Sequence, residues 1–141
     1  MRELEMLAET PAISIETTLL VHPYVLTHFV DYNDFLNVVD AVLKDMDMEN
    51  VLQVASFHPQ YQFAKTQPND IENYTNRSPY PMMHLLREAS VVQAVSAFPE
   101  AEKIFDKNIQ TLRRLGHSGW NDLGLVKVSS PVEDELMRRE P

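Results

Sequence analysis

Two apolar runs rich in β-branched residues enclose a stretch of helical periodicity, and this order restricts the fold more than any other feature. The first run extends from about Ile15 to Val21 and the second from Val51 to Phe57, and both have the composition of strands. Between them lies one apolar stripe at three- and four-residue spacing: Phe35, Val38, Val39, Val42, Leu43 and Met46. Such a stripe is typical of a helix packed on a core. The order predicts a right-handed βαβ unit with parallel strands.

The elements around this unit can be placed with the same rules. Asp31 is predicted to be the N-cap of the crossover helix, because its carboxylate can accept the first free backbone N–H groups. Residues 59–81 lack periodicity but contain four aromatic rings, so we expect an ordered loop. Helical spacing then predicts one helix from Met82 to Val95 and another from near Pro99 to Gly116, with the glycine at the C′ position.

The predicted strands are too few for a stable sheet, since two strands alone rarely suffice. A third is expected from Leu123–Val128, from the N-terminus or from a second chain. The fold class is therefore α/β: a small parallel sheet with a βαβ unit, followed by a long ordered loop and two or three helices. We expect a single domain over residues 1–125, and a weakly structured tail or short terminal helix over residues 126–141.

Composition excludes several classes of function. The 141 residues include 12 basic and 21 acidic ones, giving a formal net charge of −9, which opposes nucleic-acid binding. No cysteine is present, so a disulfide or thiolate nucleophile is excluded. The three glycines all lie in the last third, so no phosphate-binding glycine loop can follow an early strand. We expect a soluble, cytoplasmic protein without nucleotide cofactor, nucleic-acid partner or membrane association.

A candidate site follows from the way the two strands end. Each finishes on a His-Pro pair, at His22 and at His58. Ligands of open parallel sheets bind beyond the carboxyl ends of the strands, and neighbouring strands lie roughly 4.8 Å apart, so the two imidazoles are expected to converge. The following loop would add Arg77, whose planar fork suits a carboxylate or phosphate, and then His84.

These residues predict a small-ligand-binding or enzyme-like protein. His58, Arg77 and His84 are the candidate catalytic residues, with one histidine as general acid or base. The candidate ligand-binding residues are His22, Tyr61, Asn73, Tyr74 and Asn76. The ligand would be a small anion, or a divalent metal held by His22, His58 and His84, with Asp70 or Glu72 as a further ligand.

An alternative accounts for the same residues without chemistry. His-Pro at a strand end can be a turn in which the proline fixes φ and the histidine caps the next helix. Arg77 can likewise tie its own loop to backbone carbonyls, and Arg87 and Glu88 can be solvated helix residues. The chain would then be a non-catalytic structural or protein-interaction module.

The segments "ETTLLVHP", "DYNDFL", "SFHPQYQFA" and "ENYTNRSPYPMMHLLREAS" resemble a bacterial family, domain of unknown function 1415. The resemblance covers roughly residues 15–116 and implies no reaction, because no activity is assigned to that family. Members of the family carry an N-terminal segment with a Cys-Pro-Phe element and a further strand, which this chain is expected to lack. The resemblance therefore implies an exposed sheet edge, and hence a homodimer or poor solubility.

Overall fold

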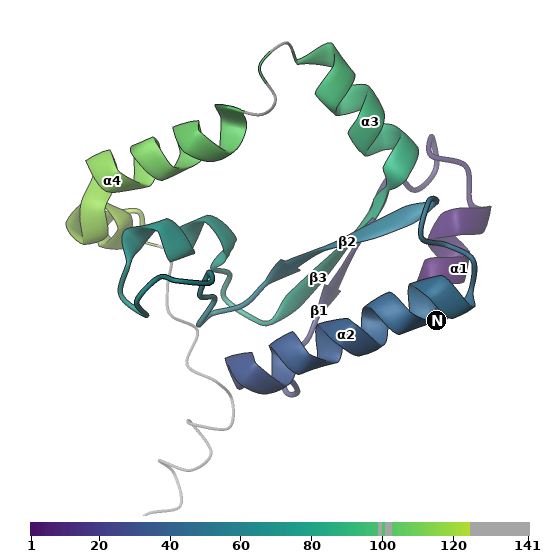
Figure 1. Cartoon of the computed structure of the whole chain (residues 1–141), viewed down its shortest axis with the longest axis horizontal. Helices are drawn as coiled ribbons and strands as arrows, with labels where there is room; N and C mark the ends of the chain where they lie inside the picture. Colours follow the sequence, from purple (N-terminus) through teal and green to yellow (C-terminus); the bar gives the residue numbers. More distant parts are fainter. Residues whose placement is uncertain (99, 101–102, 125–141) are drawn as a thin grey trace, which may run out of the picture.

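The structure is a computed structural model that describes residues 1–98, 100 and 103–124. A small sheet lies at its centre, with helices on either side (Figure 1). The predicted tail of residues 126–141 lies outside the described residues, as does most of the strand expected at 123–128. The mixed α and β content that we expected is confirmed.

The sheet has three strands in the order β1-β3-β2, formed by Thr17–Val21, Met82–Arg87 and Leu52–Phe57. Both strand pairs are antiparallel, so the prediction of a parallel sheet is wrong. β1 and β2 do run in the same direction, because each is antiparallel to β3, but β3 lies between them. The crossover helix therefore joins two strands that are not hydrogen-bonded to each other, an arrangement known as a split βαβ unit.

The third strand comes from a segment that we expected to be helical. Residues Met82–Arg87 form β3, and only the following residues, Glu88–Ala97, form helix α3. Met83 and Leu85 are buried on one face of β3, and this alternation fits a strand as well as the spacing of Met82, Leu85 and Leu86 fits a helix. Pairing with β1 and β2 decides between them, because both outer strands bond to this segment.

Two helices cover one face of the sheet. Helix α2, Phe29–Asp45, runs along this face, and α1, Arg2–Glu9, lies beside its far end (Figure 1). Between helices and sheet lies a core built on Leu4, Leu7, Leu43, Leu52 and Leu85. The predicted apolar stripe of α2 thus reaches the core through Leu43, Val39 and Val42. The predicted N-cap is wrong: α2 begins after His28, and Asp31 lies in its first turn.

The remaining helices lie on the other side of the sheet. Helix α4, Ile104–Asp122, packs on η1, a short 3₁₀ helix formed by Ile71–Asn76 within the long loop. Gly116 has a φ of +65°, the left-handed conformation expected at a helix end, but the chain resumes its helical course after this kink. Helix α3 and the start of α4 form an arch above the sheet (Figure 1).

Across the described residues, none of the helices combines the length and apolar character that would be needed to cross a bilayer.

Arg87, which we expected to be solvated, instead connects β3 to the N-terminal region. Its guanidinium group donates hydrogen bonds to the carbonyl oxygens of Leu7 at 2.7 Å, Thr10 at 2.5 Å and Ile15 at 2.8 Å. These carbonyls belong to the end of α1 and to the connection that leads into β1. One planar fork therefore fixes the path of the chain from α1 to the sheet, which a lysine cannot do with the same geometry.

We expect Arg87→Met to lower the free energy of unfolding by about 2–3 kcal/mol, because three carbonyl groups lose a charged donor. Urea denaturation followed by circular dichroism would measure the change. Arg114→Met, at an exposed position of α4, is the matched control and should shift the value by less than about 0.5 kcal/mol. Equal effects of the two substitutions would contradict this account of Arg87.

Candidate functional site

His58 is buried under the loop that follows β2. Its side chain has no exposed surface, and its ring contacts Phe29 and Tyr32 at centroid distances of 5.3 and 5.1 Å. Nδ1 accepts the N–H of Gln60 at 3.0 Å, so Nε2 carries the proton and donates it to the Leu26 carbonyl at 3.1 Å. Both ring nitrogens are thus used by the backbone of the chain itself.

Arg77 is bound by its own loop in a similar way. Its guanidinium group donates to the carbonyl oxygens of Pro68 at 2.5 Å and Tyr61 at 3.4 Å. The group also lies 4.2 Å from the centroid of the Tyr74 ring, a distance at which a cation is attracted to the ring face. These contacts hold both ends of the loop together, as the alternative interpretation of Arg77 requires.

The other candidate loop residues also stabilise residues 59–81. Asn73 is fully buried; its Oδ1 accepts from the Phe63 N–H at 3.0 Å, and its Nδ2 donates to the Gln67 carbonyl at 2.7 Å. Asn76 donates to the carbonyl of Ser56 at 3.1 Å, which fixes the loop to β2. Tyr74 packs edge-on against Trp120 of α4. The loop is therefore an ordered structure, as expected.

Tyr61 and the two acidic candidates also lie on this loop. The Tyr61 ring packs on Phe29 and Phe63 at centroid distances of 5.3 and 5.0 Å. Asp70 accepts the backbone N–H of Gln67 at 2.8 Å. Glu72 pairs with Arg113 of α4, and its own backbone N–H together with this partner holds the pKa of its carboxyl group below the usual value.

His84 lies apart from the loop, on the face of the sheet that α1 and α2 do not cover. It is paired with Leu19 and Ala55 in the strand register. The Thr17 hydroxyl donates to the Leu85 carbonyl at 2.6 Å and so accepts from His84 Nε2, 2.5 Å away. This places the proton of His84 on Nε2.

The three candidate metal ligands therefore do not converge. His58 lies beneath the loop, His84 lies on the uncovered sheet face, and His22 lies on the face covered by α2. No group of three or more histidine, aspartate or glutamate side chains in the described part of the chain could hold a metal ion. The catalytic roles assigned to His58, Arg77 and His84 remain predictions, and these three side chains do not share one pocket.

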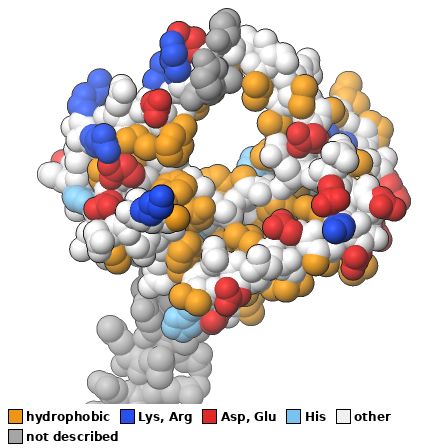
Figure 2. Space-filling model, in the orientation of Figure 1, with side chains coloured by type: hydrophobic (Ala, Val, Ile, Leu, Met, Phe, Trp, Pro, Cys, Tyr) orange, Lys and Arg blue, Asp and Glu red, His pale blue; other side chains and the backbone are white. Residues whose placement is uncertain are grey.

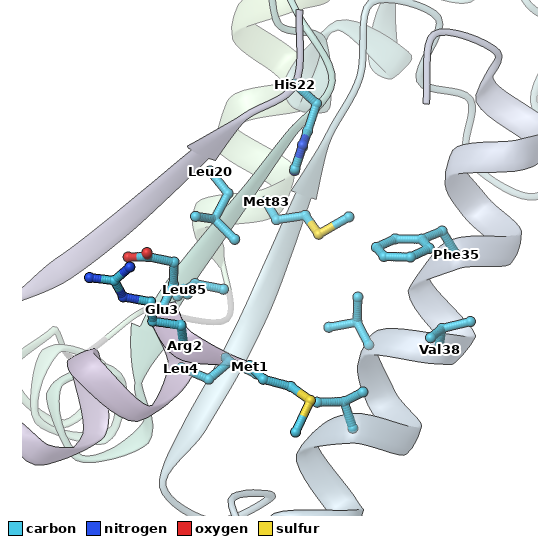
Figure 3. Close-up of a pocket in the computed structure, with 12 residues that line it drawn as sticks. Met1, Arg2, Glu3, Leu4, Leu20, His22, Phe35, Val38, Met83 and Leu85 are labelled. Atoms are coloured by element: carbon cyan, nitrogen blue, oxygen red, sulfur yellow. The ribbon is translucent and has the colours of Figure 1, made fainter. Parts of the chain in front are cut away.

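His22 is the predicted site residue that faces a cavity. Its backbone N–H continues the ladder of β1 by donating to the Pro81 carbonyl at 2.9 Å, and its side chain points to the same side of the sheet as Leu20. There it lies at one end of a cavity of about 320 Å³ between α2, the sheet and the start of α1 (Figure 3). The ring atom Nε2 is buried and has no hydrogen-bond partner among the described residues.

The rest of this cavity is mostly apolar. Side chains of Leu20, Met83 and Leu85 come from the sheet, and those of Phe35 and Val38 come from α2 (Figure 3). Arg2 and Glu3 of α1 supply the charged groups of the lining. Burial lowers the pKa of His22 below its usual value, because the charged imidazolium loses its hydration there.

The sequence identified the apolar stripe of α2 but not the cavity. Phe35 and Val38 lie on this stripe and were expected to face the core, yet they remain partly exposed at the cavity. The distance between a helix and a sheet depends on all the side chains that lie between them, so a local sequence pattern does not predict it. The signal that could have located the site was His22 itself, at the end of a strand opposite this stripe.

Burial of neutral His58 predicts a pH dependence of stability. Its folded pKa is lowered, first by desolvation, so the unfolded chain binds a proton more readily. The free energy of unfolding should therefore fall as the pH drops below about 6.5, by at most about 1.4 kcal/mol per pH unit for this residue. His58→Gln should reduce this slope in urea denaturation between pH 7.5 and 5.5.

The exposed His117 of α4 provides the control for that experiment. His117→Gln should leave the slope unchanged. If His58→Gln also leaves it unchanged, the lowered pKa deduced from the burial of His58 is incorrect.

The comparisons with known proteins agree with the resemblance seen in the sequence. No curated protein and no solved structure matches the chain. One family matches residues 1–122, which is most of the chain, and it is described as a protein of unknown function (DUF1415). The match includes both His-Pro pairs, the loop that carries Arg77, and all the elements that line the cavity beside His22. The chain belongs to the DUF1415 family.

Proposed function

We propose that this protein binds a small, neutral and mainly apolar molecule in the cavity between α2 and the sheet, with one polar group hydrogen-bonded to His22. The observation that carries the proposal is the buried Nε2 atom of His22, which faces the cavity and has no hydrogen-bond partner in the part of the chain that the structure describes. A buried polar atom without a hydrogen bond costs free energy. A ligand group placed against it would recover that free energy.

The size of the cavity supports a ligand of about two fused rings. Ligand pockets usually enclose about 300–1,000 Å³, and the volume of about 320 Å³ falls at the lower end of this range. An apolar cavity of about 150 Å³ is known to bind benzene. Roughly twice that volume suits a bicyclic aromatic molecule or a short aliphatic chain.

The electrostatics of the cavity favour a neutral ligand over the small anion that we first expected. His22 has a lowered pKa, so its imidazole is neutral at neutral pH and supplies no positive charge inside. Phe35, Val38 and Met83 offer no hydrogen bond that could replace the hydration of an anion. Arg2, the first residue of α1, also lines the cavity. It is exposed to solvent, so water screens its positive charge.

A non-catalytic structural or protein-interaction module is the second candidate for the function of this chain, and one observation favours it. His58 and Arg77 are bound by backbone groups of the chain itself, which is the arrangement expected if these residues only support the fold. A docking function would need an apolar surface elsewhere. The face of the sheet opposite α2, where Leu19 and Val21 are exposed, is such a surface.

Binding of 2-naphthol and naphthalene to the purified chain would test the proposed ligand class. Fluorescence titration should give a dissociation constant about fivefold lower for 2-naphthol, because its hydroxyl group gains one hydrogen bond of about 1 kcal/mol with His22. His22→Leu should remove this difference while naphthalene still binds. Val38→Trp should fill the cavity and weaken binding of both compounds at least tenfold.

Val30→Trp, on the exposed side of the same helix, is the matched control and should not change binding. Equal affinity of wild type and Val38→Trp would place the ligand elsewhere. Tighter binding of 2-naphthoate than of 2-naphthol would overturn the proposal of a neutral ligand in favour of an anionic one.

A further inference from the structure

The sheet has two edges, and they differ in how far the chain itself covers them. β3 lies between β1 and β2, so these two strands form the edges. An edge strand directs every second pair of backbone N–H and C=O groups away from the sheet, where they can bind a further strand. The groups that remain free therefore decide where such a strand can be added.

The edge formed by β2 is occupied at both of its ends. At its start, the Leu52 N–H donates to the Met48 carbonyl at 3.0 Å. Near its end, the Ser56 carbonyl accepts a hydrogen bond from the Asn76 side chain at 3.1 Å, and the His58 N–H donates to the Asn76 carbonyl at 3.1 Å. The turn before β2 and the loop after it thus limit access to this edge.

In the part of the chain that the structure describes, the edge formed by β1 is free along its whole length. The His22 N–H donates to the Pro81 carbonyl on the β3 side, and the direction of these groups alternates along a strand. The N–H and carbonyl groups of Thr17, Leu19 and Val21 therefore point away from β3. Among the described residues none of these groups has a hydrogen-bond partner, and all three residues are exposed.

β1 also lacks the features that usually protect an edge strand. Natural sheets protect such strands with charged side chains, proline or a β-bulge. The sequence TTLLV has no charged residue and no proline, and its register with β3 is unbroken from Thr17 to Val21. Leu19 and Val21 add apolar side chains that are 54% and 47% exposed. This edge is therefore suited to the addition of a strand.

The helices above this part of the sheet do not close it off. Leu19 and Val21 lie on the face opposite α2, where Figure 1 shows α3 and the start of α4 as an arch above the sheet. The space-filling view in Figure 2 shows an opening between this arch and the sheet. The side chains of an added strand could therefore lie beside Leu19 and Val21.

Residues on either side of β1 leave one register for a second β1 strand. Antiparallel pairing centred on Leu19 places Leu19 opposite its own copy and Thr17 opposite Val21, so that all their outward groups bond across the contact. A shift by two residues in one direction would place Val21 opposite Ile15, whose N–H and carbonyl already bond within the chain. A shift in the other direction would place Thr17 opposite Pro23, which has no N–H. The edge is thus its own complement.

Charge does not oppose this pairing. The formal net charge of −9 repels a second copy at long range, but β1 itself has no charged residue. Glu16 immediately precedes the strand and His22 immediately follows it. The register centred on Leu19 places Glu16 of one copy opposite His22 of the other, and so avoids two carboxylates opposite each other, which would destabilise the pair.

We propose that two copies of the chain pair through the free edge of β1, antiparallel and centred on Leu19, and so form one sheet of six strands. A second copy fits this edge better than an unrelated strand, because the same residues supply both sides and define the register. The contact is isologous and closes after two copies. It involves a strand of five residues, so we expect a weak dimer. It does not require a ligand in the cavity.

Sedimentation velocity of the full chain between about 10 μM and 1 mM would test this dimer. Wild type should pass from monomer to dimer in this range. Leu19→Lys and Leu19→Glu should each weaken the dimer at least about tenfold, because like charges then lie opposite each other. An equal mixture of the two variants should restore the dimer, because the introduced lysine then lies opposite the introduced glutamate.

Val30→Lys is the matched control, since it introduces a charge at an exposed valine of α2, and it should dimerise as wild type does. A wild type that remains monomeric over the whole range, or Leu19 variants that dimerise as wild type does, would overturn the proposal. Failure of the mixture to associate would overturn the pairing of Leu19 with its own copy, and with it the proposed dimer.

Amide hydrogen exchange provides a second measurement that requires no substitution. The N–H groups of Leu19 and Val54 both point outward, each at a different edge of the sheet. The proposal expects the Leu19 amide to exchange at least about threefold more slowly as the protein concentration rises, while exchange of the Val54 amide stays the same. Equal behaviour of the two amides, or slow exchange of the Leu19 amide at every concentration, would contradict the proposed contact.

Discussion

The position of β3 between β1 and β2 is the constraint on which the rest of this structure depends. Both outer strands form their ladders with β3, so the sheet cannot assemble before residues 82–87 are in place. Side-chain hydrogen bonds fix the position of β3 in the sheet at both of its ends. At its start the buried hydroxyl of Tyr32 donates to the Met82 carbonyl at 2.7 Å and accepts the Phe57 N–H at 3.1 Å; at its end Arg87 binds three carbonyls of the N-terminal region.

Central β3 also explains why the two His-Pro pairs do not form one site. Two strand spacings separate the ends of β1 and β2, roughly 10 Å in place of about 5 Å. His22 therefore turns toward α2, where its Nε2 atom reaches the cavity. His58 enters a separate environment beneath the loop, where Phe29 and Tyr32 enclose its ring. Burial of Tyr32 in the same cluster raises the pKa of its hydroxyl group to about 12, which keeps it a hydrogen-bond donor at all ordinary pH values.

Local patterns in the sequence were sufficient for the elements that have one clear periodicity. The strands ending at Val21 and Phe57 and the helix between them were predicted correctly as elements, because composition and spacing agree there. The segment after Pro81 was not, because the spacing of Met82, Leu85 and Leu86 fits a helix and the alternation of Met83 and Leu85 fits a strand. Only contacts with residues far along the chain distinguish the two, and these contacts also determine whether the sheet is parallel. Similarly, the sequence shows that His22 follows a strand, but the hydrogen-bond partners of His58 and Arg77 are backbone groups that no residue type reveals.

Helix α3 has a consequence for the energetics of any contact it makes. It contains ten residues and buries none of them, and an isolated helix of this length is only marginally stable in water. Its helical order therefore has little support from the rest of the chain, and the amide hydrogens of this segment should exchange with solvent far faster than those of β3. A surface that covers α3 would have to provide the free energy that orders it, so folding of this helix and binding would be a single coupled event. Affinity would then be lower than the contact area alone suggests, and the exchange rate of these amides would report occupancy directly.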